Sequence, residues 1–349
     1  MNREELLLKY QGEVQEYIEE EQKNLKQWYK RECIAFQSRL KEAVVKGYKE
    51  KNSAILYIQI SLLRCEIQSH QYWLEVTCYD ENYFLDQKGH SQFFKVNELF
   101  LPLKKIREYL SKKSGNYYGK IEQFEIDSQI IQIATNFFKS LVPEYRMFFR
   151  DFMEWEEIQT FRNNERNKIV IKWGFHQEES ETIYRKEFNK KSQEEFLEVN
   201  KNNTVKEWKI QNIYQSFDNC EFKQLQIEMM NLLFSSYRKS SFFECIFLGI
   251  LLYGATFYNA TLEKVTFFHC DLSQSDFRNC DLKEVEFIQC NLQNCDFENI
   301  TFAQLTFHEC EMKDAIFSRE GIERLGLQAS DLQKIRIKEK MYVFGHESR

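Results

Sequence analysis

The chain has little proline and glycine, and it lacks long apolar runs. Of its 349 residues only two are proline, Pro102 and Pro143, and 11 are glycine. No stretch rich in proline, glycine or serine marks a linker, so we expect the domains to pack directly on one another. No segment approaches the roughly 18 apolar residues of a membrane-spanning helix, and the N-terminal segment does not have the form of a signal peptide. These absences predict a cytoplasmic protein with no membrane partner.

Sequence signatures of catalysis are missing too. The chain has no phosphate-binding glycine loop, no dinucleotide-binding glycine motif, no zinc-binding H-E-x-x-H and no G-x-S-x-G. Cys65 with His70, and Trp173 with His176, are neighbours in sequence with no geometric argument for a site, and ordinary buried or solvated side chains explain them. We therefore predict no catalytic, cofactor-binding or metal-binding residues. An enzyme site assembled from distant parts of residues 1–213 is the alternative, because catalytic groups need not be close in sequence.

The chain does contain a five-residue repeat. From Phe242 to Phe317 every fifth residue is Phe, Leu or Met, 16 times in succession. The residue two positions earlier is small or compact, and the other three are mostly polar. This period is neither the 3.6 of a helix nor the 2 of a strand, and a fixed period indicates a repeat architecture. Seven of the ten cysteines share its phase, namely Cys220, Cys245, Cys270, Cys280, Cys290, Cys295 and Cys310.

The repeat unit resembles that of a known family. The segments CDLSQ, SDFRN, CDLKE, CNLQN and CDFEN match the consensus of pentapeptide-repeat proteins, which is a small residue, Asp or Asn, Leu or Phe, and two free positions. The resemblance covers residues 240–319 and implies a right-handed quadrilateral β-helix with four pentapeptides in each coil. In that fold the large residue and the small residue before it point inward, and coils stack about 4.8 Å apart.

Cysteine then falls at the small inward position of the repeat. One such column is Ile250, Cys270, Cys290 and Cys310, and Ala, Val or Ser occupies the same position elsewhere. This use indicates a small hydrophobic side chain that fills a narrow interior. A metal site made of Cys270, Cys290 and Cys310 is the alternative, but no Cys-x-x-Cys pair is present and thiols in a dry core ionise poorly. We predict structural cysteines without disulfides, as expected in a reducing compartment.

The expected fold class is an α+β N-terminal domain followed by the pentapeptide-repeat β-helix. Hydrophobic periodicity predicts one or two long helices over 3–50, strands within 54–86, helices at 102–112 and 119–165 with a break at Pro143, a strand pair over 168–188, and helix and connector over 190–213. The expected domains are 1–213 as a helix-rich mixed α+β head, 214–239 as a degenerate first coil or a capping segment, 240–319 as the β-helix, and 320–349 as a C-terminal cap and tail.

The repeat region is acidic, with 12 Asp and Glu against five Lys and Arg in residues 240–319. An acidic rod suggests DNA mimicry, as the resemblance implies for family members that protect DNA gyrase from quinolones. Against this, the acidic residues occupy the consensus Asp or Asn position, can bond to nearby backbone, and lie on all four faces. A DNA-mimic modulator of gyrase or topoisomerase therefore remains an alternative, with no direct nucleic-acid binding expected. The candidate acidic surface is Asp271, Asp276, Asp281, Glu286 and Asp296.

One outward column of the repeat is apolar instead of polar. It consists of Leu248, Phe268, Ile288 and His308, and it forms a ridge that either the N-terminal domain or a partner could cover. We expect a non-enzymatic protein–protein interaction or scaffold protein that presents a rigid β-helix surface to an unidentified protein partner or to a second copy of itself. A composition rich in Lys, Glu, Asn, Ile and Phe is compatible with a bacterial origin.

Overall fold

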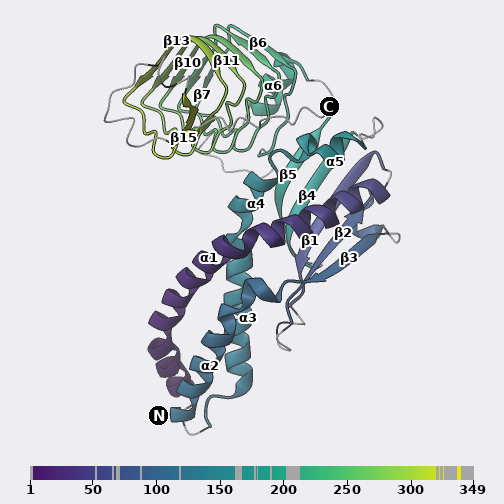
Figure 1. Cartoon of the computed structure of the whole chain (residues 1–349), viewed down its shortest axis with the longest axis vertical. Helices are drawn as coiled ribbons and strands as arrows, with labels where there is room; N and C mark the ends of the chain where they lie inside the picture. The colour runs from purple at the N-terminus through teal and green to yellow at the C-terminus, as the bar shows by residue number, and fades with distance from the viewer. Residues whose placement is uncertain are drawn as a thin grey trace, which may run out of the picture. The chain divides into compact units, whose positions relative to one another are not determined.

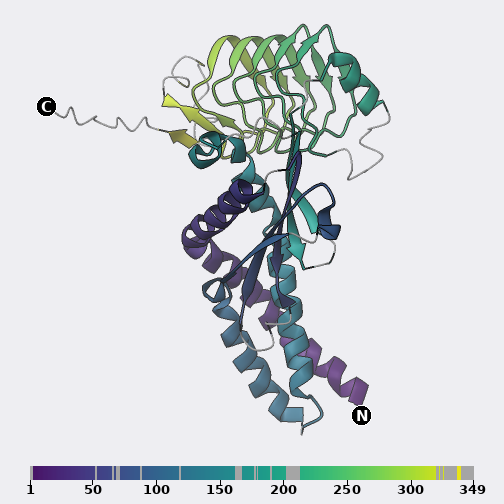
Figure 2. The ribbon, with the colours of Figure 1, turned by 90° about the vertical axis from the view of Figure 1, so that its right-hand side faces the viewer.

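A computed structural model describes residues 3–51, 53–64, 67, 71–86, 89–117, 119–161, 167–176, 178, 180–188, 191–201, 213–319, 322, 325 and 336–338. The chain divides into two compact units, Met1–Arg185 and Lys186–Arg349 (Figures 1 and 2). This boundary lies earlier than the expected division at 213/214, because the helix that follows Lys186 packs on the repeat. Among the described residues, no helix is long and apolar enough to cross a membrane.

The first unit combines long helices with a sheet. Its elements are α1 (Arg3–Glu50), β1 (Ile55–Leu62), β2 (Trp73–Tyr79), η2 (Tyr83–Leu85), β3 (His90–Lys95), η3 (Asn97–Phe100), α2 (Pro102–Ser114), η4 (Gly115–Tyr117), α3 (Gln123–Ser140), α4 (Val142–Phe149), η5 (Phe152–Glu154), α5 (Glu156–Gln159), β4 (Lys168–Phe175) and β5 (Ser180–Glu187). The helical region breaks at Pro143 as expected, and Pro143 lies in the first turn of α4. A backbone N–H in the first turn has no partner within the helix, so proline is tolerated there.

The single long helix α1 packs within its own unit. Its first half lies along α2, where the Tyr17 and Tyr109 rings stack with centroids 3.7 Å apart. Farther along, the Tyr29 hydroxyl donates to that of Tyr145 on α4 at 2.7 Å. Figure 1 shows α1 beside α2 and α3 and then crossing the sheet. These intramolecular contacts bury the apolar stripe of α1, which a partner helix would otherwise have to cover.

The five strands of this unit form one mixed sheet in the order β3-β2-β1-β4-β5. β1 pairs antiparallel with β2 and parallel with β4, so β1 and β4 end at the same edge. The face that carries Ile58 and Ile60 is apolar and fully buried. Trp173 fixes the helices to this face, because its ring stacks on Phe138 and its indole N–H donates to the Phe138 carbonyl at 2.9 Å.

The second unit begins with a helix that closes one end of the repeat. Ser192 and Glu195 form a capping box at the start of α6 (Gln193–Asn200), which fixes where this helix begins. Phe196 is buried, and its ring meets that of Phe217 edge-on at 5.0 Å. Ser216 already bridges to Ser236 in the 20-residue step, so residues 214–239 form solenoid and α6 supplies the cap. An end coil needs such a cover because no neighbouring coil buries it.

The repeat forms a solenoid of about five turns over residues 221–317. All strand pairs are parallel and in register with a step of 20 residues, as in Val265↔Val285 and Val285↔Leu305. The last pair joins Phe317 to Ile337, so the step persists beyond the clear repeats, while most of the predicted cap at 320–349 lies outside the described residues. The strands are β6 (Glu221–Lys223), β7 (Gln226–Glu228), β8 (Ser241–Phe243), β9 (Ile246–Leu248), β10 (Thr261–Phe268), β11 (Asp281–Ile288), β12 (Asp296–Phe297), β13 (Thr301–His308), β14 (Ile316–Ser318) and β15 (Arg336–Lys338).

Phenylalanine rings fill the solenoid interior in ladders. Phe257, Phe277 and Phe297 stack face to face with centroids 4.8 and 5.0 Å apart. A second ladder through Phe267 and Phe287 meets the first edge-on, with Phe277 and Phe287 at 5.7 Å and 86°. Stacked and edge-on arrangements are the favourable geometries for aromatic pairs, so each ring is stabilised by the coils above and below it.

Every fifth backbone residue from 214 to 314 turns the corner of a coil with a positive φ. Asn259, Asn279 and Asn299 lie at such corners with φ of 58–59°. Asparagine tolerates this left-handed conformation better than most residues, because its short amide can bond locally. Glycine has the same use at Gly249 and Gly254.

Candidate functional site

The predicted apolar column lies in register on the outside of the solenoid. Phe268 pairs with Leu248 on one side and with Ile288 on the other, and Ile288 pairs with His308. Leu248, Phe268 and Ile288 are half-buried and His308 is exposed. Parallel strands in exact sequence step place equivalent side chains roughly 4.8 Å apart along the stack. The three apolar side chains therefore form a continuous ridge.

The apolar area is wider than the ridge. On the same segment of β9, Ile246 is 43% exposed, and the neighbouring corner residue Met229 is 48% exposed. Met229 lies over Gly249, where a Cβ atom would come within 2.6 Å of the methionine sulfur. Glycine at 249 thus makes room for this methionine. We call the set Met229, Ile246, Leu248, Phe268 and Ile288 the apolar strip.

The sequence did not reveal that Met229 belongs to this surface. Residues 214–239 follow the repeat only loosely, and the corner position of a pentapeptide has no apolar consensus. The available signal was the 20-residue step between Met229 and Gly249. The same step relates Phe234 to Gly254, where a Cβ atom would lie 2.6 Å from the phenylalanine ring.

The five acidic residues proposed as a surface do not form one. Asp276 is fully buried and Asp296 is 9% exposed. Arg278 holds both, since its Nε lies 2.8 Å from Asp276 Oδ1 and 3.7 Å from Asp296 Oδ2. A buried carboxylate needs such a partner to offset its lost hydration. These two residues therefore stabilise the stack and offer no exposed charge.

The other three acidic residues lie apart from one another. Asp271, Asp281 and Glu286 pair with Asn291, Thr301 and Thr306 of the following coil, at three separate positions around the coil. Lys283 forms a 2.8 Å ion pair with Asp281 and lowers the pKa of that carboxyl. Of these three, Glu286 is exposed and the other two are half-buried. A continuous acidic face, which DNA mimicry requires, is not formed by these residues.

The inward cysteines act as hydrogen-bond donors as well as packing groups. Cys280 Sγ contacts the Phe257 carbonyl at 3.0 Å, and Cys295 Sγ contacts the Leu272 carbonyl at 2.9 Å. Ser275 makes the same bond through its hydroxyl to Leu252 at 2.8 Å. Burial raises the pKa of the Cys280 thiol well above its usual value. A buried, protonated thiol is a poor nucleophile and a poor metal ligand.

The column of Cys270, Cys290 and Cys310 exists as predicted from the 20-residue step. Each thiol contacts a carbonyl of the preceding coil, at 3.3 Å in all three cases. The neighbouring Cys270 thiol, followed by burial, raises the pKa of Cys290 to about 12. In the part of the chain that the structure describes, no three His, Cys, Asp or Glu residues are arranged to hold a metal ion.

In the first unit, the polar face of the sheet carries a histidine–carboxylate contact that the sequence did not reveal. His176 follows β4, and its Nδ1 lies 2.5 Å from Glu75 Oε2 on β2. Thr77 donates to Glu75 Oε1 at 2.9 Å, and Ser61 lies opposite Glu75 with its hydroxyl buried and without a partner among the described residues. The partners are 101 residues apart, so only the strand pairing brings them together. His176 is thus oriented by Glu75, and the Trp173 neighbour considered from the sequence points to the opposite face.

The chain was compared with known proteins. The family model described as pentapeptide repeat region matches residues 240–317. No curated protein matches the chain. Among solved structures, a pentapeptide repeat protein from the Arabidopsis thaliana thylakoid lumen is 21% identical, with 32% of this chain and 70% of that chain covered and a TM-score of 0.17.

Two further structures are similar. QnrB1, a plasmid-mediated fluoroquinolone resistance protein, is 14% identical, with 37% of this chain and 82% of that chain covered and a TM-score of 0.19. The pentapeptide repeat protein Rfr23 from the cyanobacterium Cyanothece 51142 is 9% identical, with 29% and 90% covered and a TM-score of 0.15. The 20-residue register and the family match agree on the second unit of this chain: residues 240–317 are a pentapeptide repeat region.

Proposed function

We propose that this chain is a protein-interaction protein whose solenoid presents the apolar strip to a protein partner. The observation that carries the proposal is the in-register row of half-buried Leu248, Phe268 and Ile288, next to the exposed Ile246. Apolar side chains in a continuous exposed patch mark interaction sites far more often than scattered ones do. The pentapeptide-repeat fold fits this role.

The shape of the strip suits a flat contact. Its residues project from parallel strands whose inward neighbours Phe247, Phe267 and Phe287 are fully buried and stacked. The surface is therefore stiff, and little conformational entropy is lost when a partner binds. Methionine and aromatic residues are also enriched in the centres of protein interfaces.

The rim of the strip indicates the charge of the partner. Glu228 flanks it on β7 and Glu286 on β11, and both are exposed. The repeat region as a whole carries a formal charge of −7, from 12 acidic and five basic residues. Opposite charge at the rim of an interface favours encounter and orients the partner. We propose a partner with an apolar centre and basic rim residues.

The test compares two double variants of the full chain. Phe268→Asp/Ile288→Asp places two charges in the strip. Thr261→Asp/Ala303→Asp adds the same two charges at exposed positions on β10 and β13, outside the strip. Both variants and the wild type serve as bait in native cytosol, and each is also examined by light scattering and thermal unfolding. We expect a bound protein, or a dimer of this chain, that only the strip variant loses.

Two results would contradict the proposal. One is a set of bound proteins that is the same for all three baits. The other is a large fall in melting temperature for the strip variant alone, which would mean that the strip is covered within the chain. The lack of a catalytic site, the compartment and the bacterial origin stay predictions. DNA mimicry is less well supported, because two of the five acidic residues expected at the surface, Asp276 and Asp296, are buried.

A further inference from the structure

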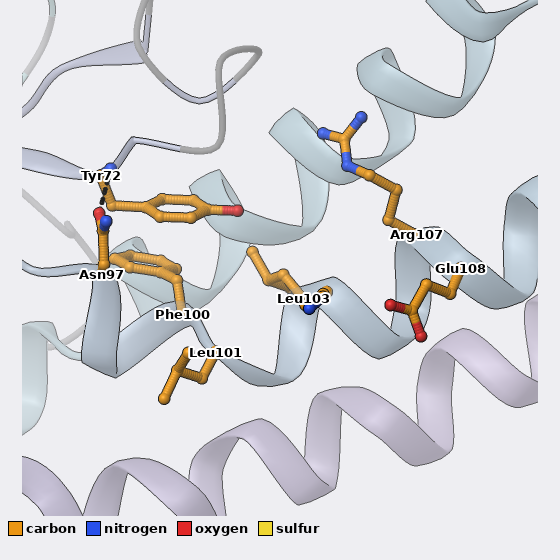
Figure 3. A pocket seen from close by; sticks show the side chains of 8 residues that line it. Tyr72, Asn97, Phe100, Leu101, Leu103, Arg107 and Glu108 are labelled. Atoms are coloured by element: carbon orange, nitrogen blue, oxygen red, sulfur yellow. Dashed lines mark hydrogen bonds between the residues drawn. The ribbon is translucent and has the colours of Figure 1, made fainter.

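We infer that the first unit contains a binding pocket for a small amphipathic carboxylate, a function separate from the interaction proposed for the solenoid. The cavity has a volume of about 410 Å³ and is formed where η3 leads into α2 (Figure 3). This volume lies at the lower end of the range for small-molecule sites, roughly 300–1,000 Å³. The described residues that line it are Tyr72, Asn97, Phe100, Leu101, Leu103, Lys104, Arg107 and Glu108.

The floor of the pocket is apolar and fixed in place. The Tyr72 and Phe100 rings stack with centroids 4.4 Å apart and planes 10° from parallel. The backbone N–H of Tyr72 donates to Asn97 Oδ1 at 2.8 Å, a bond that Figure 3 shows and that ties the start of β2 to η3. Leu103 is almost fully buried. A ring or a short branched chain can lie on this floor without moving the protein.

The wall opposite the floor carries a cation with spare hydrogen-bonding capacity. Arg107 pairs with Asp127 through Nη1, and its side chain is only 11% exposed. Its Nη2 is buried and has no hydrogen-bond partner among the residues that the structure describes. A guanidinium presents five donors, and an unpaired buried donor is costly unless a ligand or water satisfies it. Arg107 lines the pocket, so a carboxylate oxygen there would supply that acceptor once the guanidinium turns toward the cavity.

Two further groups define the charge of the ligand. Lys104 is exposed one turn before Arg107 on α2 and brings a second positive charge to the mouth. Burial raises the pKa of Tyr72 to about 12, so its phenol stays protonated and can donate. Figure 3 shows this hydroxyl on the side of the ring that faces the Arg107 helix. Glu108 is exposed at the rim and limits the net charge, which favours a monoanion over a phosphate dianion.

Calorimetry with the full chain tests the assignment, with 2-naphthoate as the anionic probe and 2-naphthamide as its neutral counterpart. We expect naphthoate to bind and naphthamide to bind at least tenfold more weakly. Arg107→Gln should weaken naphthoate about tenfold or more, because a neutral amide cannot replace a charge-assisted hydrogen bond to the carboxylate. It should leave naphthamide nearly unchanged.

Two variants keep the test independent of the Arg107–Asp127 pair. Leu101 is 53% exposed, so Leu101→Glu should fold normally while it places a like charge at the mouth and abolishes naphthoate binding. Lys105→Gln removes an exposed charge from α2 outside the pocket and should have no effect. The inference is overturned if naphthoate does not bind at millimolar concentration, if the amide binds as well as the acid, or if Leu101→Glu binds naphthoate like the wild type. None of these results bears on the apolar strip.

Discussion

Replacing Phe277 by alanine should weaken the solenoid more than the same change at Phe317. Both rings are fully buried. Phe277 stacks on Phe257 and Phe297 and meets Phe267 and Phe287 edge-on, which gives four aromatic pairs. Phe317, in the last clear repeat, makes two such pairs with described residues, one stacked on Phe297 and one edge-on to Phe307.

The size of the difference follows from these pairs. A buried Phe→Ala change costs about 3–5 kcal/mol, and each aromatic pair contributes about 0.5–1.5 kcal/mol beyond its buried area. The two additional pairs should therefore make Phe277→Ala costlier than Phe317→Ala by about 1–3 kcal/mol. Phe277→Leu keeps most of the volume and loses only the ring contacts, so we expect an intermediate cost.

The assay should report on the solenoid alone, because the two units can unfold separately. The buried thiols of Cys280, Cys290 and Cys295 allow this. A short pulse of a thiol reagent in rising urea, followed by mass spectrometry of the peptides, gives an unfolding midpoint for these coils. Cys33 on α1 is half-exposed and serves as the control for reagent activity. Equal midpoint shifts for Phe277→Ala and Phe317→Ala would refute the view that stacking between coils determines local stability.

Three other changes test the solenoid. Cys280→Ser should fold, because Ser275 makes the equivalent hydrogen bond. Burial raises the folded pKa of the Cys280 thiol above its ordinary 9.0, so its contribution to stability is intact below pH 9 and falls by up to about 1.4 kcal/mol per pH unit above it. The serine variant should therefore lose less stability at alkaline pH, which urea unfolding at pH 7.5 and 10 measures. Asn279→Val should cost about 1–2 kcal/mol or more in the same assay, because a β-branched residue is strained at φ 59°, whereas Asn279→Gly should be nearly neutral. Arg278→Met should cost about 3–5 kcal/mol because it removes the cation beside two buried carboxylates, and adding Asp276→Asn should restore part of that loss; no restoration would argue against the shared ion pair.

Much of the second unit could be predicted from the sequence. A period of five with a step of 20 fixes which side chains face inward, because every coil repeats the same backbone geometry. The ridge at Leu248, Phe268 and Ile288 followed from this rule, as did the column through Cys270 and Cys290. The rule did not reveal that Asp276 is buried, because its position in the consensus points outward. Arg278, which pairs with it, occupies a position of the pentapeptide where the consensus allows any residue.

The first unit shows where sequence reasoning ends. Periodicity indicated its helices and most of its strands, since amphipathic patterns are local. It did not indicate β3, the sheet order, or the pairing of Glu75 with His176, which depends on β2 and β4 both neighbouring β1. The carboxylate pocket likewise brings together Tyr72 and Arg107, which no spacing rule relates. The stack of the Tyr72 ring on Phe100 places Tyr72 there.

The sequence by itself determined the repeat, and its resemblance to pentapeptide-repeat proteins implied the coil length and the inward role of the cysteines, because these depend on one local geometry used again and again. Only the tertiary structure decided how the first end of the solenoid is covered, which acidic residues are neutralised, and where a cation in the first unit has a donor without a partner among the described residues. Those features depend on contacts between segments that are distant in the chain, and burial and charge pairing there are set by packing.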